Sequence, residues 1–268
     1  MPELPEIFII ARQMNHALAG KTVRSLRIVQ PKCLNRPEEE YHHMMPGRTV
    51  LSVTPLGKWI ALGMDHEMRL MINLGMGGEI CRMKDGSPAP GKYQLIVTLS
   101  GGIGFYVSLW WFGYFHLILS GETHAMTDFL GPDPLTLSVQ AFKDLLDGRR
   151  GQIKPFLLNQ KHIRGIGNFY IQEILFRARL HPRRTIPSLQ NSEIVMLLEA
   201  IQGVMKKSIR LGSSAYELDF YGQKGRYNLE CMGFAYRESG ICPLCGAVTE
   251  KIATGSTSQY ICPSCQKP

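Results

Sequence analysis

Long hydrophobic runs are missing from this sequence of 268 residues. No stretch of about 18 uninterrupted apolar residues occurs, which argues against a membrane-spanning helix. Low-complexity and collagen-like segments are missing too, because 44% hydrophobic and 19% charged residues, with 27 Gly and 16 Pro, are typical of a globular chain. The first residues lack the basic segment of a secretory signal, so we expect a reducing compartment and interpret the seven Cys as thiols rather than disulfides.

An excess of positive charge is absent from the first half of the chain. Residues 1–140 contain 12 Lys and Arg against 12 Asp and Glu, whereas residues 141–268 contain 18 against 10, so the whole net charge of +8 lies in the second half. A basic region beside a neutral one is typical of a protein that binds a polyanion, most often a nucleic acid. A basic surface without a partner explains the charge equally well.

The hydrophobic periodicity predicts an α+β protein with two main domains. Residues 5–19 have apolar side chains at helical spacing, with Pro5 suited to the first turn and Gly20 following the last. Short β-rich runs separated by turn residues fill residues 22–117 and indicate an antiparallel sandwich or barrel, and residues 131–134 form a linker. The predicted strands are 23–29, 49–54, 59–64, 69–74, 93–99 and 103–109; the predicted later helices are 139–146, 153–159, 168–180 and 192–211, followed by a mobile loop at 212–230.

Two Cys-x-x-Cys pairs stand near the end of the sequence. Cys242 and Cys245 form the first pair, and Cys262 and Cys265 follow after 16 residues. Four thiolates at this spacing are typical of one tetrahedral Zn²⁺ site. Because four protein ligands leave no open position, such an ion is structural, and its binding supplies folding free energy to a module too small for an apolar core. Two redox pairs are the weaker alternative.

Three landmarks resemble the bacterial formamidopyrimidine-DNA glycosylase and endonuclease VIII family. They are the start Pro-Glu-Leu-Pro-Glu at residues 2–6, Gly-Ile-Gly-Asn at residues 165–168, and the paired cysteines. The resemblance runs from residue 2 to residue 266. It implies an N-terminal β-sandwich with a helix at residues 1–130, a helix–two-turns–helix domain with a lesion loop at 135–230, and a four-cysteine zinc finger at 231–268. It also implies that double-stranded DNA with a damaged or abasic site binds in a cleft between the two halves.

The N-terminal residues are where the resemblance places the reaction. If Met1 is removed, Pro2 is a terminal secondary amine; α-amino groups titrate near about 8, so it is partly unprotonated and nucleophilic at neutral pH. The resemblance implies that Pro2 attacks the deoxyribose C1′ to form a Schiff base, that Glu3 is the general acid and base, and that Glu6 supports Pro2. Lys58 is implied to hold the lesion phosphate or to donate a proton. The residues alone fit a plain helix start.

Further residues match positions at which the family contacts DNA. Met76 and Phe112 match side chains that fill the gap left by a flipped nucleotide, Gly167 and Asn168 match a phosphate-binding turn, and Arg149, Arg150 and Lys154 match cations that contact the strand. Taken singly, each also fits a structural interpretation: a core Met or Phe beside a turn, an N-cap asparagine, or a solvated cation.

The sequence departs from the family at several of these contacts. Trp110 and Trp111 stand where the family usually has two arginines that enter the duplex, and Asn73 stands where it has a histidine. An indole stacks on a base but does not bind its hydrogen-bonding edge as a guanidinium does. The family's finger carries an arginine about five residues before its third cysteine, whereas residues 255–260 here contain no Arg or Lys. The phosphate clamp of the finger is therefore lacking or supplied from elsewhere.

These features give one hypothesis and two rivals. We expect a monomeric base-excision repair enzyme of the bacterial cytoplasm, associated with the nucleoid and without a membrane partner. It is a DNA glycosylase for oxidised or otherwise damaged bases, with AP lyase activity by β-elimination and one structural Zn²⁺. The first rival is a relative that binds lesions with weak or no excision, because several DNA contacts are replaced. The second is a zinc-ribbon RNA-binding or translation factor, which leaves residues 2–6 unexplained.

Overall fold

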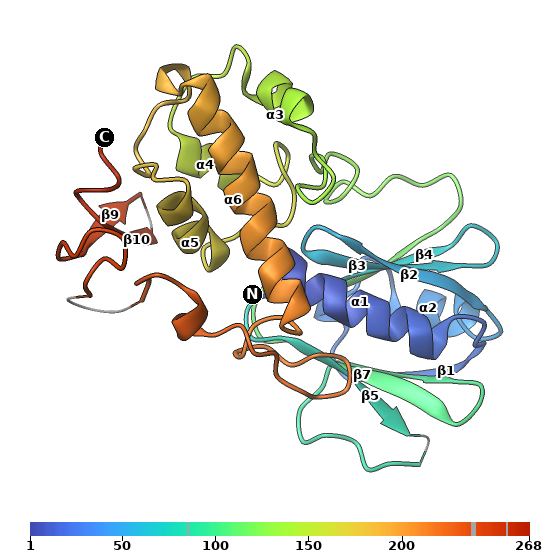
Figure 1. Cartoon of the computed structure of the whole chain (residues 1–268). Helices are drawn as coiled ribbons and strands as arrows, with labels where there is room; N and C mark the ends of the chain where they lie inside the picture. The colour runs from blue at the N-terminus through green and yellow to red at the C-terminus, as the bar shows by residue number, and fades with distance from the viewer. Residues whose placement is uncertain (85, 237–239, 256) are drawn as a thin grey trace. The chain divides into compact units, whose positions relative to one another are not determined.

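The computed structural model describes residues 1–84, 86–236, 240–255 and 257–268. The chain forms two compact units, Met1–Asp128 with Gly212–Arg226 and Phe129–Leu211 with Tyr227–Pro268 (Figure 1). The segment Gly212–Arg226 therefore packs with the first unit, although it follows the helices of the second in the sequence. Ser256, in the stretch of the finger that lacks Arg and Lys, lies outside the described residues. No helix within the described ranges has the length and apolarity to cross a membrane.

The first unit contains helix α1 and two antiparallel sheets. α1 (Leu4–Leu18) begins and ends one residue before the predicted helix. The sheets have the strand orders β1-β6-β7-β5 and β2-β3-β4-β8. The strands are β1 Val23–Ile28, β2 Val50–Leu56, β3 Trp59–Met64, β4 Arg69–Asn73, β5 Glu79–Lys84, β6 Leu95–Leu99, β7 Ile103–Ser108 and β8 Tyr114–Ile118. Strands β5 and β8 and the short helix α2 (Glu38–Met44) were not predicted from the sequence.

One apolar core joins α1 to both sheets. It contains Ile7 and Met14 from α1 together with side chains such as Leu62 of β3 and Phe105 of β7. Phe220, from the segment Gly212–Arg226, is fully buried in the same core, with its ring centroid 6.4 Å from that of Phe105. The segment is thus anchored by a large apolar side chain, unlike the mobile loop that its Gly and Ser content suggests.

The second unit is mainly helical. Its helices are α3 Val139–Leu146, α4 Ile153–Leu158, α5 Tyr170–Arg177 and α6 Asn191–Arg210, with short 3₁₀ turns at Ile186–Ser188 and Leu229–Cys231. The long helix α6 packs against α3 and α5. Phe169 is the N-cap of α5, so Asn168 precedes the cap and is not itself the N-cap.

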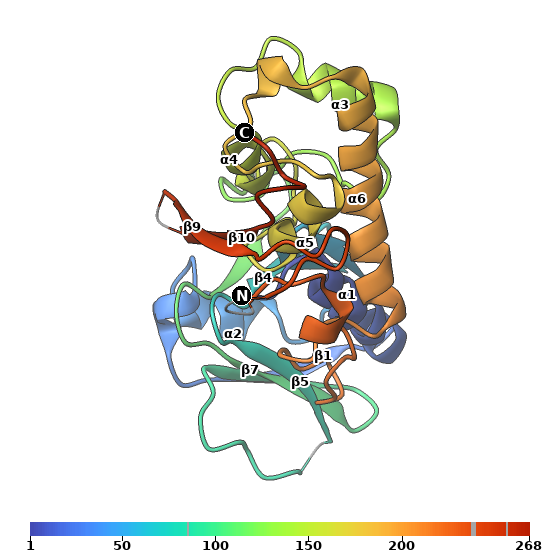
Figure 2. The ribbon, with the colours of Figure 1, turned by 60° about the vertical axis from the view of Figure 1, so that its left-hand side comes forward.

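The finger, residues 240–268, is a β-hairpin flanked by the two cysteine pairs. Its strands are β9 (Glu250–Thr254) and β10 (Thr257–Ile261), which lie together in Figure 2. The side chain of Gln172 in α5 donates to the carbonyl of Ser258 and accepts from the N–H of Tyr260, both at 3.0 Å. These paired bonds extend the edge of the hairpin and fix it to α5.

Candidate functional site

The first turn of α1 is organised by two glutamates. Glu3 is the N-cap: its side chain accepts from the backbone N–H of Glu6, while Glu6 Oε2 accepts from the N–H of Glu3 at 2.9 Å. This reciprocal capping box satisfies two backbone donors that a helix start leaves unpaired. Pro2, Glu3 and Glu6 are all buried. The helix-start interpretation of these residues is therefore correct, and it also holds two carboxylates beside Pro2 in defined orientations.

The segment Gly212–Arg226 packs on this N-terminal turn. The backbone N–H of Ser214 donates to Glu6 Oε1 at 3.1 Å, so both carboxylate oxygens of Glu6 accept a backbone hydrogen bond. The terminal ammonium of Met1 lies 3.4 Å from Glu217 Oε1. Sequence reasoning missed both contacts because they join residues more than 200 positions apart, and no local pattern reports such pairs.

Lys58 lies in the two-residue turn that joins β2 to β3. Gly57, at φ 63°, takes the left-handed conformation of this turn. The buried side chain of Asn73 donates to the carbonyl of Lys58 at 3.0 Å and accepts from the N–H of Gly75 at 2.9 Å. Asn73 therefore ties the Lys58 turn to the loop that carries Met76.

Four apolar side chains project into solvent from two adjoining loops of the first unit. We call Met76, Trp110, Trp111 and Phe112 the apolar tip; they are 46%, 70%, 62% and 65% exposed. The N–H of Met76 donates to the carbonyl of Trp111 at 2.9 Å, which joins the loops. A Cβ on Gly75 would lie 2.0 Å from the same carbonyl, so only glycine fits there. Phe112 has φ 57°, a strained value that the joined loops maintain. A core role for Met76 and Phe112 is thereby excluded.

The predicted contact residues of the second unit divide by burial. Arg149 and Arg150 follow α3 and are exposed, as is Asn168, whereas Gly167 is buried. The hydroxyl of Tyr236 donates to the carbonyl of Asn168 at 2.9 Å and fixes the backbone before α5. The exposed arginines and the Asn168 side chain are accessible to a ligand.

Lys154 is the exception among the cations, because it is only 2% exposed. Its Nζ donates to Thr254 Oγ1 at 2.6 Å and to Thr257 Oγ1 at 3.2 Å, and burial lowers its pKa to about 8. It lines a pocket of about 410 Å³ together with Asn168 and Gln152. The solvated-cation interpretation of Lys154 is wrong. Sequence reasoning missed both threonines, since nothing local marks a hydroxyl on the finger as a partner of α4.

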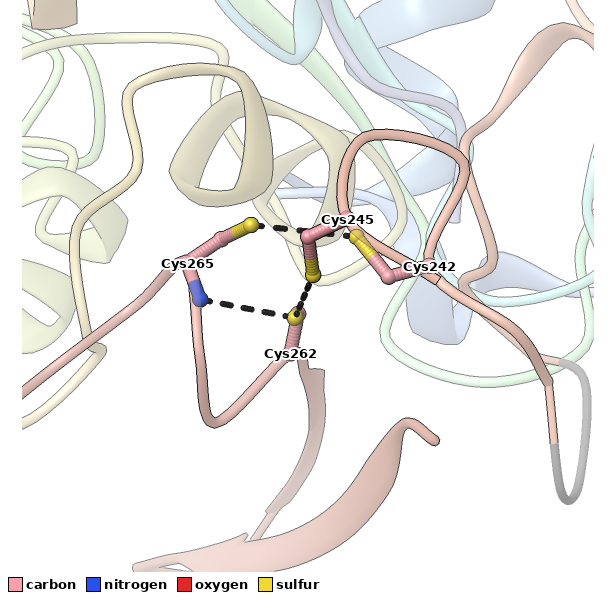
Figure 3. Close-up of side chains that lie close together, drawn as sticks. All are labelled: Cys242, Cys245, Cys262 and Cys265. Atoms are coloured by element: carbon pink, nitrogen blue, oxygen red, sulfur yellow. Dashed lines mark hydrogen bonds between the residues drawn. The ribbon is translucent and has the colours of Figure 1, made fainter. Parts of the chain in front are cut away.

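The four cysteines of the finger converge on one point (Figure 3). Their Sγ atoms all lie within 4.8 Å of one another, with 3.8 Å between Cys242 and Cys265 and 3.5 Å between Cys245 and Cys262. All four are free thiols. Four sulfurs about 2.3 Å from a tetrahedral Zn²⁺ are separated by about 3.8 Å from one another, so this donor set fits a metal ion. The cluster could hold a metal, and the two-redox-pair alternative loses its support.

Comparisons with known proteins agree with this description. Residues 1–114 match the family model of the formamidopyrimidine-DNA glycosylase N-terminal domain, and residues 130–219 match that of the formamidopyrimidine-DNA glycosylase H2TH domain. The chain is 30% identical to a formamidopyrimidine-DNA glycosylase of Pelotomaculum thermopropionicum, over 100% of this chain and 99% of the relative. It is 32% identical to one of Chloroflexus aurantiacus, over 99% and 98%.

Solved structures with a similar fold come from Lactococcus lactis. A complex of its Fpg with DNA containing an abasic site has a TM-score of 0.89 and 25% identity, covering 99% of this chain and 100% of that chain. A complex of the wild-type protein with DNA containing N7-benzyl-Fapy-dG has a TM-score of 0.90 and 25% identity, with complete coverage of both chains. The two matched models and these neighbours together span both units of the chain.

Proposed function

Because the chain belongs to the formamidopyrimidine-DNA glycosylase family, we propose that it excises damaged bases from double-stranded DNA and then cleaves the abasic strand by β-elimination. Family membership makes the chain a DNA glycosylase. The lyase step is our extension of that activity. The observation that carries it is the N-terminal turn, where two buried carboxylates lie beside Pro2 and are held by backbone hydrogen bonds.

Pro2 is the proposed nucleophile, after removal of Met1. The unprotonated imino nitrogen attacks C1′ of the damaged nucleotide, the C1′–N bond breaks, and the base departs with a proton from a general acid. The C1′–O4′ bond then breaks with transfer of a proton to O4′, which opens the sugar ring, and the resulting iminium acidifies C2′. Loss of the C2′ proton to a general base then breaks the C3′–O bond and releases the 3′ phosphate. The damaged base leaves with the electron pair of the C1′–N bond and is protonated, and the 3′ phosphate leaves with the electron pair of the C3′–O bond.

The two glutamates have separate proposed roles. Glu3 adjoins Pro2 and serves as the acid and base at the sugar. Glu6 serves as a positioning residue, because its oxygens accept from the N–H groups of Glu3 and Ser214 and so fix the first turn of α1. Lys58 binds the phosphate beside the lesion. The buried side chain of Asn73 donates to the carbonyl of Lys58 and so fixes the backbone of the turn that carries it.

The apolar tip is the proposed wedge that occupies the space left by the extracted nucleotide. Its four side chains are already exposed and their loops are joined, so little ordering accompanies insertion. Base–aromatic stacking contributes about 1–3 kcal/mol per base and tolerates any base. We therefore infer that Trp110 and Trp111 contact the opposite base by stacking, and that the enzyme discriminates little between opposing bases.

Zn²⁺ is the proposed occupant of the cysteine cluster. Four thiolates at tetrahedral spacing select zinc among the common intracellular ions and leave no coordination position for a substrate. When bound, the ion supplies folding free energy to the finger. It takes no part in the reaction.

Borohydride trapping on a duplex with an abasic site tests the lyase proposal. Hydride reduces the iminium to a stable amine, so the wild type gives a covalent adduct whose mass maps to Pro2; Pro2→Gly replaces the secondary amine by a primary one and should trap more slowly. Lys206→Met, an exposed change on α6, is the matched control and traps normally. Intact-mass measurement of the purified chain establishes that Met1 has been removed.

The same experiment distinguishes the rival function. A wild-type protein without Met1 that binds the abasic duplex tightly but forms no adduct is a lesion-binding relative, and the lyase proposal is then wrong. An adduct that peptide mapping places on a lysine rather than on residue 2 assigns the nucleophile to another amine.

A further inference from the structure

Arg179 occupies a backbone position that favours glycine. It follows the C-cap of α5 and has φ 55°. Its N–H donates to the carbonyl of Phe176 at 2.9 Å, and the N–H of Leu180 donates to the carbonyl of Leu175 at 3.0 Å, which are the paired bonds of a Schellman motif. Glycine adopts this conformation without the steric penalty that a Cβ introduces. An arginine here therefore costs stability, and such an outlier points to a role of its side chain outside the fold.

The end of α5 borders a pocket of about 640 Å³ that joins cations to apolar side chains. Arg179 and Lys207 both belong to its lining, together with Phe176, Met232 and Leu244. Phe176 and Met232 are buried, whereas Leu244 is exposed on the finger. A volume of this size is typical of a pocket that receives a ligand or a partner side chain.

The two cations of this pocket are available to an anion. Arg179 is exposed, and none of the described residues bonds to its guanidinium. Lys207 Nζ donates to the carbonyl of Cys231 at 3.0 Å, which fixes the ammonium and leaves two of its hydrogens for other acceptors. Neither cation forms an ion pair within the described ranges, whereas the neighbouring Arg177 is paired with Glu173 at 2.6 Å.

The rest of the lining favours a peptide over a nucleic acid. A duplex backbone presents no apolar group to Phe176 and Leu244. Glu230 is exposed in the same lining and repels successive phosphates, whereas its carboxylate accepts from the N–H groups of a peptide. Arg179 follows α5 and Asn168 precedes it, so a helix of eight residues, about 12 Å long, separates the pocket from that predicted DNA contact.

We propose that this pocket docks an acidic peptide segment of a partner protein. Arg179 and Lys207 pair with carboxylates of the peptide, and an apolar side chain close to those carboxylates enters the space beside Phe176, Met232 and Leu244. The inference goes beyond the proposed function and does not rest on it. All lining residues belong to the second unit, and none is part of the N-terminal turn or the apolar tip.

Selection from a display library of random peptides tests the chemistry of the partner. The library is exposed to the wild-type chain in the presence of a saturating duplex with a tetrahydrofuran abasic analogue, so that acidic peptides do not occupy the DNA-binding surface. Enriched peptides should carry at least two Asp or Glu close to a large apolar residue. Enrichment of neutral or basic peptides, or no enrichment, would overturn the inference.

The most enriched peptide then serves as the labelled probe in fluorescence anisotropy. Arg179→Gly should weaken its binding at least about tenfold, the scale of one charge-assisted hydrogen bond. Replacement of the acids of the peptide by amides should weaken wild-type binding by a similar factor and cause little further loss in Arg179→Gly, because both changes remove the same pair. Effects that add would place the carboxylates elsewhere and contradict the proposal.

Arg210→Gln is the matched control for the peptide measurements. It removes an exposed arginine of α6 that does not line the pocket, and it should change peptide affinity less than about twofold. An equal loss in Arg210→Gln would reduce the effect of Arg179 to general charge and overturn the docking site. Weaker duplex binding by Arg179→Gly, with no peptide enriched, would assign the pocket to nucleic acid instead.

Thermal unfolding separates the proposed role of Arg179 from a structural one. Arg179→Gly should raise the thermal midpoint by on the order of 2 °C, because it relieves the strain at the helix end. A lower midpoint would show that Arg179 stabilises the fold, and the functional interpretation of its strain would be wrong. Arg179→Asn, which tolerates the left-handed conformation but lacks the charge, should lose the peptide as fully as Arg179→Gly.

Discussion

The first unit and the finger reach a fixed geometry by different means. The first unit surrounds its N-terminal turn with an apolar core drawn from α1, both sheets and Phe220. Among the described residues, the finger has a small apolar contact in which Tyr260 packs with Phe176 and Phe234 of the same unit, and its four thiols converge on one point. The proposed reacting residues are thus placed by burial, whereas the finger, which we expect to contact the strand, contains a cysteine cluster that could hold a metal ion. Conditions that disturb one should leave the other in place.

Removal of the metal should give the largest difference in stability between the finger and the first unit. Structural zinc contributes about 10–16 kcal/mol to small modules, so chelation or Cys245→Ser should unfold the finger and weaken DNA binding by on the order of a hundredfold or more. All three Trp belong to the first unit, so their fluorescence should be unchanged. Cys231→Ser, outside the cluster, is the control. A change in Trp fluorescence that accompanies loss of the metal would contradict the prediction that the first unit stays folded without the finger.

Phe220→Ala should act on the first unit alone. Phe220 is fully buried, and truncation of a core Phe typically reduces the free energy of unfolding by about 3–5 kcal/mol. Urea unfolding followed by Trp fluorescence measures the loss. Tyr221→Ala, at a neighbouring exposed ring, should reduce it by less than about 1 kcal/mol. Metal content should be unaffected in both variants.

Acid should destabilise the first unit through His116. Burial lowers the pKa of His116 to about 4, and its Nδ1 lies 2.9 Å from Nε2 of His124. Since the folded pKa lies below the unfolded value of about 6.5, the unfolded chain binds more protons between these values. The free energy of unfolding should fall by about 1–2 kcal/mol from pH 6.5 to pH 4. In His116→Leu this part of the pH dependence should disappear; an unchanged urea profile would contradict the assignment.

The smallest expected effect concerns the apolar tip. Trp110→Arg with Trp111→Arg restores guanidinium groups that bind base edges, and should introduce a preference among opposing bases of about tenfold in kcat/KM. Single-turnover excision on duplexes that differ only in the opposing base measures it. Trp59→Phe, at a buried position, is the control. A wild type that already discriminates strongly between opposing bases would contradict the stacking role.

Much of the fold could be predicted from local pattern. α1 and β3 were predicted within one residue because apolar spacing and turn residues mark them clearly. The strand β5 (Glu79–Lys84) was missed because it mixes buried and charged side chains, and α2 (Glu38–Met44) was missed because three consecutive acids and two His conceal its single buried side chain, Tyr41. Tertiary pairing, not propensity, decides such segments.

The candidate site divides in the same way. The four cysteines could be assigned from spacing alone, because ligand type and separation nearly specify the chemistry. The roles of Pro2 and Lys58 came only from resemblance, since a proline and a lysine have no local signature of reactivity. The burial of Lys154 and its threonine partners could not be foreseen, because a lysine in a short helix is ordinarily solvated.

The chain returns from the second unit to the first at Gly212–Arg226, so the first unit cannot be separated by a single cut in the sequence. Phe220 fills the core of the first unit from a position beyond α6, and Ser214 bonds to Glu6. A fragment that stops at Asp128 would have a cavity in its core in place of the Phe220 ring. The first turn of α1 would also lose the hydrogen bond from Ser214 to Glu6. Chimeras between relatives must therefore exchange residues 1–128 and 212–226 together, so that Phe220 and the core in which it is buried come from the same protein.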